Sequence, residues 1–134
     1  MEYITLTNRD LVNLYKGLEE VKDIKGTRFS ILVAKNIKEI SESLKELDSL
    51  ATPSPKFLEV SRQVHKLAEE EKEQEIKELE EKHTDLIEER KNQIDAVEAR
   101  MGEEQKVAVH FIREDQLPDN LNSDQLLPIL PLIV

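Results

Sequence analysis

The feature that most constrains the fold is the stretch from Pro55 to Arg100, which contains no proline or glycine in its interior. It consists mainly of Glu, Lys, Gln, Leu, Ile and Ala, which α-helices favour or tolerate. A continuous helix over residues 55–100 would be about 69 Å long, at about 1.5 Å per residue. A chain of 134 residues that commits so much of its length to helix is expected to be mainly α.

The apolar side chains of this stretch follow two different helical phases. The first seam consists of Phe57, Val60, Val64 and Leu67. The second consists of Ile76, Leu79, Leu86 or Ile87, Ile94, Val97 and Met101. Between the two seams, residues 69–75 read EEEKEQE and have nothing to bury. The missing breaker residues favour one continuous helix, whereas the phase shift favours a break near 69–75 at which the chain reverses. The sequence leaves both alternatives open.

Two shorter helices are predicted before this stretch. The first covers residues 8–23, where apolar side chains recur every three or four positions. The second covers residues 28–49, and its apolar positions alternate steps of four and three, which is the pattern of a helix-pairing seam. This seam consists of Val33, Ile37, Ile40, Leu44 and Leu47. Pro53 and Pro55 then require the chain to turn before the third helix.

Both ends of the helical body alternate with period two, as β-strands do. Residues 2–6 and residues 105–112 are the two predicted strands. Because an isolated strand is not stable, we expect them to pair with each other. The predicted fold is therefore a single mainly α domain over residues 1–134. It is an antiparallel helical hairpin or bundle with a long charged helix, and its N- and C-terminal segments form a minor two-stranded β-sheet.

The charge balance excludes several classes of partner. The chain has 29 acidic and 19 basic residues and a net charge of -10, without a cluster of Lys and Arg. Direct binding to nucleic acid or to an anionic membrane depends on such a cluster, so we expect neither. The absence of cysteine excludes disulfides, thiolate metal sites and a cysteine nucleophile. No apolar run approaches the about 18 to 20 residues of a membrane span, so we expect a cytoplasmic protein.

The sequence offers no catalytic or cofactor motif. His65, His83 and His110 lie in three different segments, without the spacing of metal ligands. The serines occur at expected caps, turns and polar helix faces, outside any nucleophile motif. Glycine-rich phosphate-binding loops are absent as well. We therefore predict no catalytic residues, no bound metal, no cofactor and no enzymatic activity.

One candidate for partner binding is the acidic stretch from Glu69 to Glu89. It holds eleven acidic residues and three lysines, a net charge of -8. Such a stretch is either a solvated face of a spacer helix or a surface that engages a basic groove on another protein. The seven residues predicted to make such contacts are Glu69, Glu70, Glu71, Glu73, Glu75, Glu80 and Glu81.

The other candidate is the apolar C-terminal segment, residues 123–134. Its apolar side chains either close the open end of the helical core or dock a partner, since contiguous exposed apolar surface usually marks an interface. The residues predicted to dock are Leu127, Ile129, Leu130 and Leu132.

The chain contains three further stretches that belong to no catalytic or ligand motif. They are LTNRDLVNL at positions 6–14, GTRFSILVAKNI at positions 26–37 and LPDNLNSDQL at positions 117–126. Together with the order of predicted elements, they resemble a group of small uncharacterised proteins encoded by tailed bacteriophages. Members of that group often carry a glycine- and asparagine-containing insertion where this chain has residues 69–75. The resemblance implies a phage or prophage setting, with the host cell cytoplasm or the virion as the location.

These observations together predict a non-enzymatic phage protein that acts through contacts with a phage or host protein. Its role would be in virion assembly or as an accessory factor. The alternative is an acidic inhibitor of a host nucleic-acid enzyme or defence system, which would mimic nucleic acid through its charge. We also expect a homo-oligomer, because a continuous third helix would leave residues 76–101 without enough partner helix in their own chain.

Overall fold

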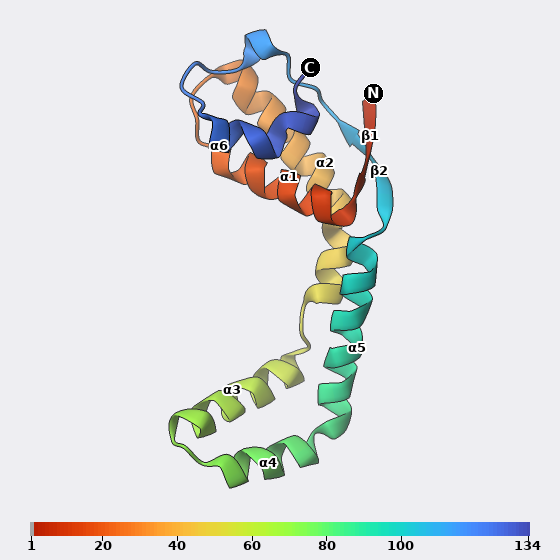
Figure 1. Ribbon diagram of the computed structural model, residues 1–134, viewed down its shortest axis with the longest axis vertical. Helices are drawn as coiled ribbons and strands as arrows, with labels where there is room; N and C mark the ends of the chain where they lie inside the picture. Colours follow the sequence, from red (N-terminus) through yellow and green to blue (C-terminus); the bar gives the residue numbers. More distant parts are fainter. Residues whose placement is uncertain (1) are drawn as a thin grey trace. The chain divides into compact units, whose positions relative to one another are not determined.

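The computed structural model describes residues 2–134, and over them the predicted mainly α fold is confirmed, at 71% helix with a small antiparallel sheet (Figure 1). Within this range, no helix combines the length and apolar character that crossing a membrane requires. The elements are, in order, β1 (Glu2–Thr7), α1 (Asn8–Val21), α2 (Thr27–Ala51), α3 (Pro55–Glu69), α4 (Glu73–Lys82), α5 (Thr84–Met101), β2 (Glu104–Val109), the 3-10 turn η1 (Glu114–Gln116), α6 (Ser123–Leu126) and the 3-10 segment η2 (Leu127–Leu132).

Where one helical domain was expected, the internal contacts separate into two compact units. The first, here called the terminal unit, combines the described residues up to Glu46 with Arg100–Val134. The second, the central unit, is Leu47–Ala99. The chain passes from the terminal to the central unit within α2 and returns within α5.

The predicted pairing of the two end strands is confirmed. β1 and β2 are antiparallel, with Ile4 opposite Val107 and Glu2 opposite Val109. The side chains of Ile4, Val107 and Val109 lie on the inner face, whereas Tyr3 is exposed on the outer face. On that outer face the Lys106 ammonium lies 4.9 Å from the centre of the Tyr3 ring. The alternation of the sequence therefore predicts which side chains share each face of the sheet.

The core of the terminal unit is fully closed. Leucines of α1, Phe29 and aliphatic residues of α2, and the inner face of β2 are all buried together. The C-terminal segment completes this core, since α6 and η2 pack against α1 (Figure 1). The approach is close at Gly17 of α1, where any Cβ would collide with the ring of Pro128. The fully buried large side chains are Phe29, Leu11, Leu14, Leu18, Ile40, Ile112, Ile129, Leu132, Val21, Val33, Val107 and Val109.

A buried amide ends the second strand. Asn36 of α2 is fully buried, and its Nδ2 donates to the carbonyl oxygen of His110 over 2.8 Å. Its Oδ1 accepts from the backbone N–H of His110, also over 2.8 Å. Asn36 thus makes the two hydrogen bonds that a neighbouring strand would make, and no buried side-chain polar atom among the described residues lacks a partner.

The predicted extent of that strand was wrong at its C-terminal end. We expected residues 105–112, whereas β2 ends at Val109. Asn36 takes both backbone groups of His110. Beyond it the chain changes partner, because Ile112 pairs in parallel with Ile133 of the C-terminal segment. The alternation consequently loses its phase after Val109, and Ile112 is buried although Phe111 is only half-buried.

A second asparagine joins the start of α1 to the end of α5. The side chain of Asn8 donates to the carbonyl oxygen of Arg100 over 2.7 Å, and its backbone N–H donates to the carbonyl of Glu103 over 2.9 Å. Gln105 of β2 donates to the Asn8 Oδ1 and also to the carbonyl oxygen of Ser43, at 3.3 Å for the latter. The bond to Arg100 satisfies a carbonyl in the last turn of α5, which has no partner within the helix.

Replacing Asn36 with leucine should lower the free energy of unfolding by about 2 to 3 kcal/mol, because two backbone groups of His110 lose their partner. Urea unfolding followed by circular dichroism measures this loss. The matched control is Asn13→Leu, at an exposed position of α1, which should change stability by less than about 0.5 kcal/mol. Equal losses for the two variants would contradict the role of Asn36.

Candidate functional site

The chain reverses at the acidic stretch, so the predicted helix 55–101 is not continuous. α3 ends at Glu69 and α4 begins at Glu73, and the two helices pack against each other as a hairpin (Figure 1). The N–H of Lys72 bonds the carbonyl of Leu67, and the N–H of Glu71 bonds that of Ala68. Glu71 has φ of 55°, in the left-handed region. This is the Schellman arrangement that ends many helices, with glutamate at the position usually held by glycine.

A second break, which the sequence analysis missed, separates α4 from α5 at His83. The Thr84 hydroxyl donates to the carbonyl oxygen of Glu81 over 2.9 Å, and the backbone of His83 leaves helical geometry. Hydroxyl bonds to the preceding turn often bend helices. The stretch without proline or glycine therefore contains three helices, α3, α4 and α5.

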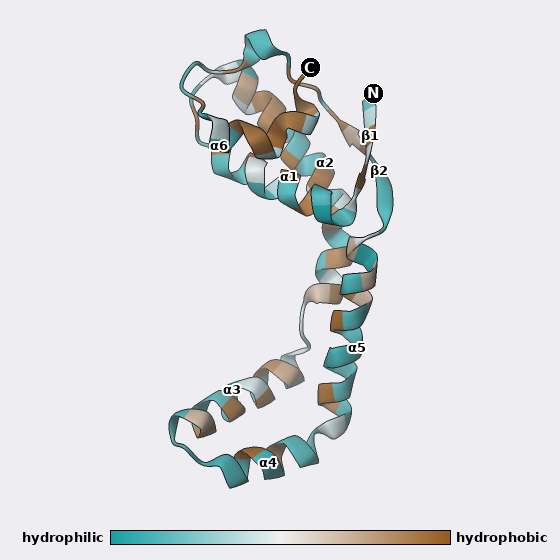
Figure 2. Ribbon diagram, in the orientation of Figure 1, coloured by the Kyte–Doolittle hydropathy of each residue, from teal (hydrophilic) through white to brown (hydrophobic). Residues whose placement is uncertain are grey.

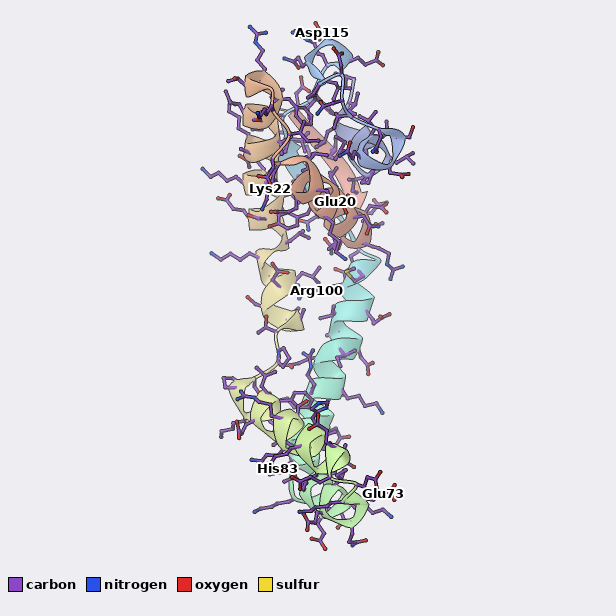
Figure 3. The ribbon with its side chains drawn as sticks, turned by 90° about the vertical axis from the view of Figure 1, so that its left-hand side faces the viewer. Glu20, Lys22, Glu73, His83, Arg100 and Asp115 are labelled. Carbon is purple, nitrogen blue, oxygen red and sulfur yellow. The ribbon has the colours of Figure 1, made fainter. Side chains whose placement is uncertain are left out.

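The seven acidic candidates all lie exposed on the hairpin. Glu69 ends α3, Glu70 and Glu71 form the turn, and the other four belong to α4. Figure 2 shows α4 as largely hydrophilic, and Figure 3 labels Glu73 and His83, which mark its two ends. The four in α4 are Glu73, Glu75, Glu80 and Glu81. The structure thus brings these residues together on one element pair.

One lysine at the turn partly offsets this charge. The Lys72 ammonium lies 3.0 Å from a carboxylate oxygen of Glu70 and 4.0 Å from one of Glu75. Its hydrogen bond holds the pKa of Glu70 below the ordinary value and raises the pKa of Lys72. Because both groups are exposed, water screens this pair. Among the described residues, Glu71, Glu73, Glu80 and Glu81 form no ion pair.

The apolar seams of the central unit are only partly covered. Of its large apolar side chains, only Leu47 and Val60 are buried, whereas Leu58 and Ile94 are clearly exposed. α3 and α5 meet where the Arg90 guanidinium lies 5.9 Å from the centre of the Phe57 ring. The half-buried side chains are Leu50, Phe57, Val64, Leu67, Ile76, Leu79, Leu86, Ile87 and Val97.

A groove of about 590 Å³ follows the α3–α4 hairpin. Its lining combines the half-buried Leu67 and Leu79 with charged side chains of both signs, among them Lys66, Glu70 and Lys82. Apolar and charged groups therefore stand side by side along the hairpin.

The four C-terminal candidates divide into two pairs. Ile129 and Leu132 are fully buried against the terminal unit, so they serve its core and cannot also dock a partner. Leu127 and Leu130 remain 61% and 50% exposed. The prediction that Ile129 and Leu132 dock a partner was therefore wrong. They are three residues apart, which places both side chains on the inner face of η2.

The histidines stay in separate elements. His65 of α3 lies 3.2 Å from a carboxylate oxygen of Glu69, His83 follows α4, and His110 follows β2. In the part of the chain that the structure describes, no group of three or more His, Asp or Glu side chains is placed to hold a metal ion.

Comparisons with models of known protein families, with curated proteins and with solved structures found no match to this chain.

The strain at Glu71 can be measured directly. Glu71→Gly should stabilise the protein by about 1 kcal/mol, since glycine adopts positive φ without steric cost. The matched control, Glu78→Gly, removes the same charge from the interior of α4 and should destabilise by about 1 kcal/mol. Denaturant unfolding of both variants tests this. If Glu71→Gly were the more destabilising of the two, the turn would not have the described geometry.

Proposed function

We propose that this protein is a non-enzymatic binding factor that acts through protein–protein contacts, and that the α3–α4 hairpin makes those contacts. The observation that carries the proposal is the contrast in burial between the two units. The terminal unit closes its core, whereas the hairpin leaves its seam half-covered and its carboxylates exposed. Partly covered apolar surface on a protein that has a closed core elsewhere is typical of interaction sites.

The resemblance of the sequence to small phage proteins supports a phage setting for this activity. In that setting the partner is a phage or host protein, and the role is in virion assembly or as an accessory factor. The net charge of -10 argues for a protein partner, because nucleic acid and anionic lipid would be repelled.

The test compares two exposed apolar residues in quantitative capture of partners from cells that contain the protein. Leu58 of α3 is 42% exposed and Ile31 of α2 is 48% exposed, so neither substitution should affect folding. Leu58→Lys should reduce recovery of the partner about tenfold or more, as loss of an interface anchor does. Ile31→Lys should leave recovery unchanged. Equal recovery with both variants, or no partner for the unaltered protein, would contradict the proposal.

A second candidate function is an acidic inhibitor of a host nucleic-acid enzyme or defence system. It is favoured by the unpaired carboxylates of Glu71, Glu73, Glu80 and Glu81, which the hairpin presents together. A surface of this kind can occupy a basic groove that normally holds nucleic acid.

Salt separates the two candidates. Binding through apolar seams should survive about 0.5 M salt, whereas binding through the carboxylates should be lost as charges are screened. In the second case, lysine at positions 70, 73, 80 and 81 should abolish capture of the partner. Capture that is unchanged by these four substitutions would eliminate the inhibitor.

A further inference from the structure

One face of α5 leaves a large apolar side chain uncovered. Ile94 is 47% exposed, the largest such fraction among the large apolar residues of the central unit. Beside it, a small groove of about 100 Å³ is lined by Ala51, Arg90, Val97 and Glu98 as well. Nearly half of the Ile94 side chain is therefore in contact with water, although exposure of an aliphatic side chain is unfavourable.

Three charged residues flank this face: Arg90 lies over the Phe57 ring, and the other two form no ion pair in their own chain. Lys91 and Glu98 are both exposed, and neither has a charged partner among the described residues. They stand seven residues apart, so they lie on the same side of α5, next to Ile94 and Val97. A helix face with an apolar centre and opposite charges along one edge is the pattern of helix pairing.

These charges are complementary to a second copy of the same face. When two identical helices pair antiparallel, a two-fold axis between them places the same edge of each helix side by side. Lys91 of one copy then stands opposite Glu98 of the other, and the symmetry repeats the pair. Such a self-complementary surface is what a two-fold interface requires.

We infer that α5 pairs antiparallel with α5 of a second copy of this chain, with Ile94 and Val97 packed between the helices and Lys91 opposite Glu98 in both directions. Three of the five carboxylates of α5 lie away from this face, and Asp95 stands on the outer side of the edge that carries Lys91 and Glu98. Asp85, Glu88 and Glu89 line a different groove, which lies around the helix from Ile94 and includes Leu50 and Ala96. Antiparallel pairing also keeps these carboxylates away from their copies, whereas parallel pairing would place them side by side.

This pairing goes beyond the proposed function and does not rest on it, because it uses α5 and leaves the α3–α4 hairpin free. It also differs from the self-association expected from the sequence, which required a continuous helix over residues 55–101. The turn at Glu71 interrupts that helix, and the pairing inferred from the structure uses the uncovered face of α5 instead.

The test is sedimentation equilibrium of the full chain at about 100 µM, a concentration well above the Kd of a micromolar pair. The mass should be twice the 15.5 kDa of one chain. Lys91→Glu and Glu98→Lys each place like charges opposite each other and should weaken pairing about tenfold. The double variant restores opposite charges and should pair within about threefold of the unaltered chain. An equimolar mixture of the two single variants should form a mixed dimer, which also shows that each variant is folded.

Matched controls are Lys77→Glu in α4 and Glu88→Lys on the other side of α5, which make the same charge changes away from the face and should leave the mass unchanged. A monomer at this concentration would overturn the inference. So would single variants whose Kd equals that of the unaltered chain, or a failure of the double variant to restore pairing. Capture of another protein through Leu58 is measured separately, so the failure of one proposal leaves the other distinguishable.

Discussion

Pairing of β1 with β2 is the interaction on which the terminal unit depends. It joins segments at opposite ends of the chain, and the bond between Asn8 and Gln105 spans 97 positions of sequence. Ordering so long a loop costs chain entropy, which two hydrogen-bonded strands alone do not recover. The side chains on the inner face of the sheet provide the remainder, since Val107 and Val109 are buried in the core that α1 and α2 build.

Two buried asparagines, Asn8 and Asn36, fix where the segments that follow α5 and β2 bind the terminal unit. Asn36 replaces a third strand at His110, and Asn8 bonds the carbonyl of Arg100 at the end of α5. Asn36 satisfies two backbone groups of His110 that would otherwise lack partners, and a buried unpaired group costs more than a made bond gains. The C-terminal segment also provides backbone partners, because Ile133 pairs with Ile112 just after β2 has ended. The terminal unit therefore buries a core of its own, although Leu127 and Leu130 remain on its surface. The central unit buries less, and its helices hold their shape through caps, turns and half-covered apolar seams.

Sequence periodicity was enough for the fold class, the helices before Pro53 and the pairing of the end strands. It could not decide the hairpin, because the turn uses Glu71 in a conformation that a pattern of residue types assigns to glycine. The end of β2 depends on Asn36, 74 positions away, and nothing in residues 105–112 indicates it. In the C-terminal segment, the spacing of the apolar residues shows that Ile129 and Leu132 share one face of η2. Which face is buried depends on the close approach of η2 to Gly17, which the sequence does not indicate. The role of the acidic residues in binding stays a prediction, since exposure shows where they are and not what they contact.

The terminal unit has a buried core, whereas the central unit has half-covered seams. We therefore expect the central unit to have the lower local stability. Native-state hydrogen exchange measures this most directly, because it gives an opening free energy for each segment. Amides of α1 and β2 should exchange only through global unfolding, whereas those of α3 and α4 should exchange through openings that cost about 2 to 4 kcal/mol less. Equal protection across all four elements would contradict this difference, since it would mean that the half-covered seams of the hairpin are as firmly packed as the buried core.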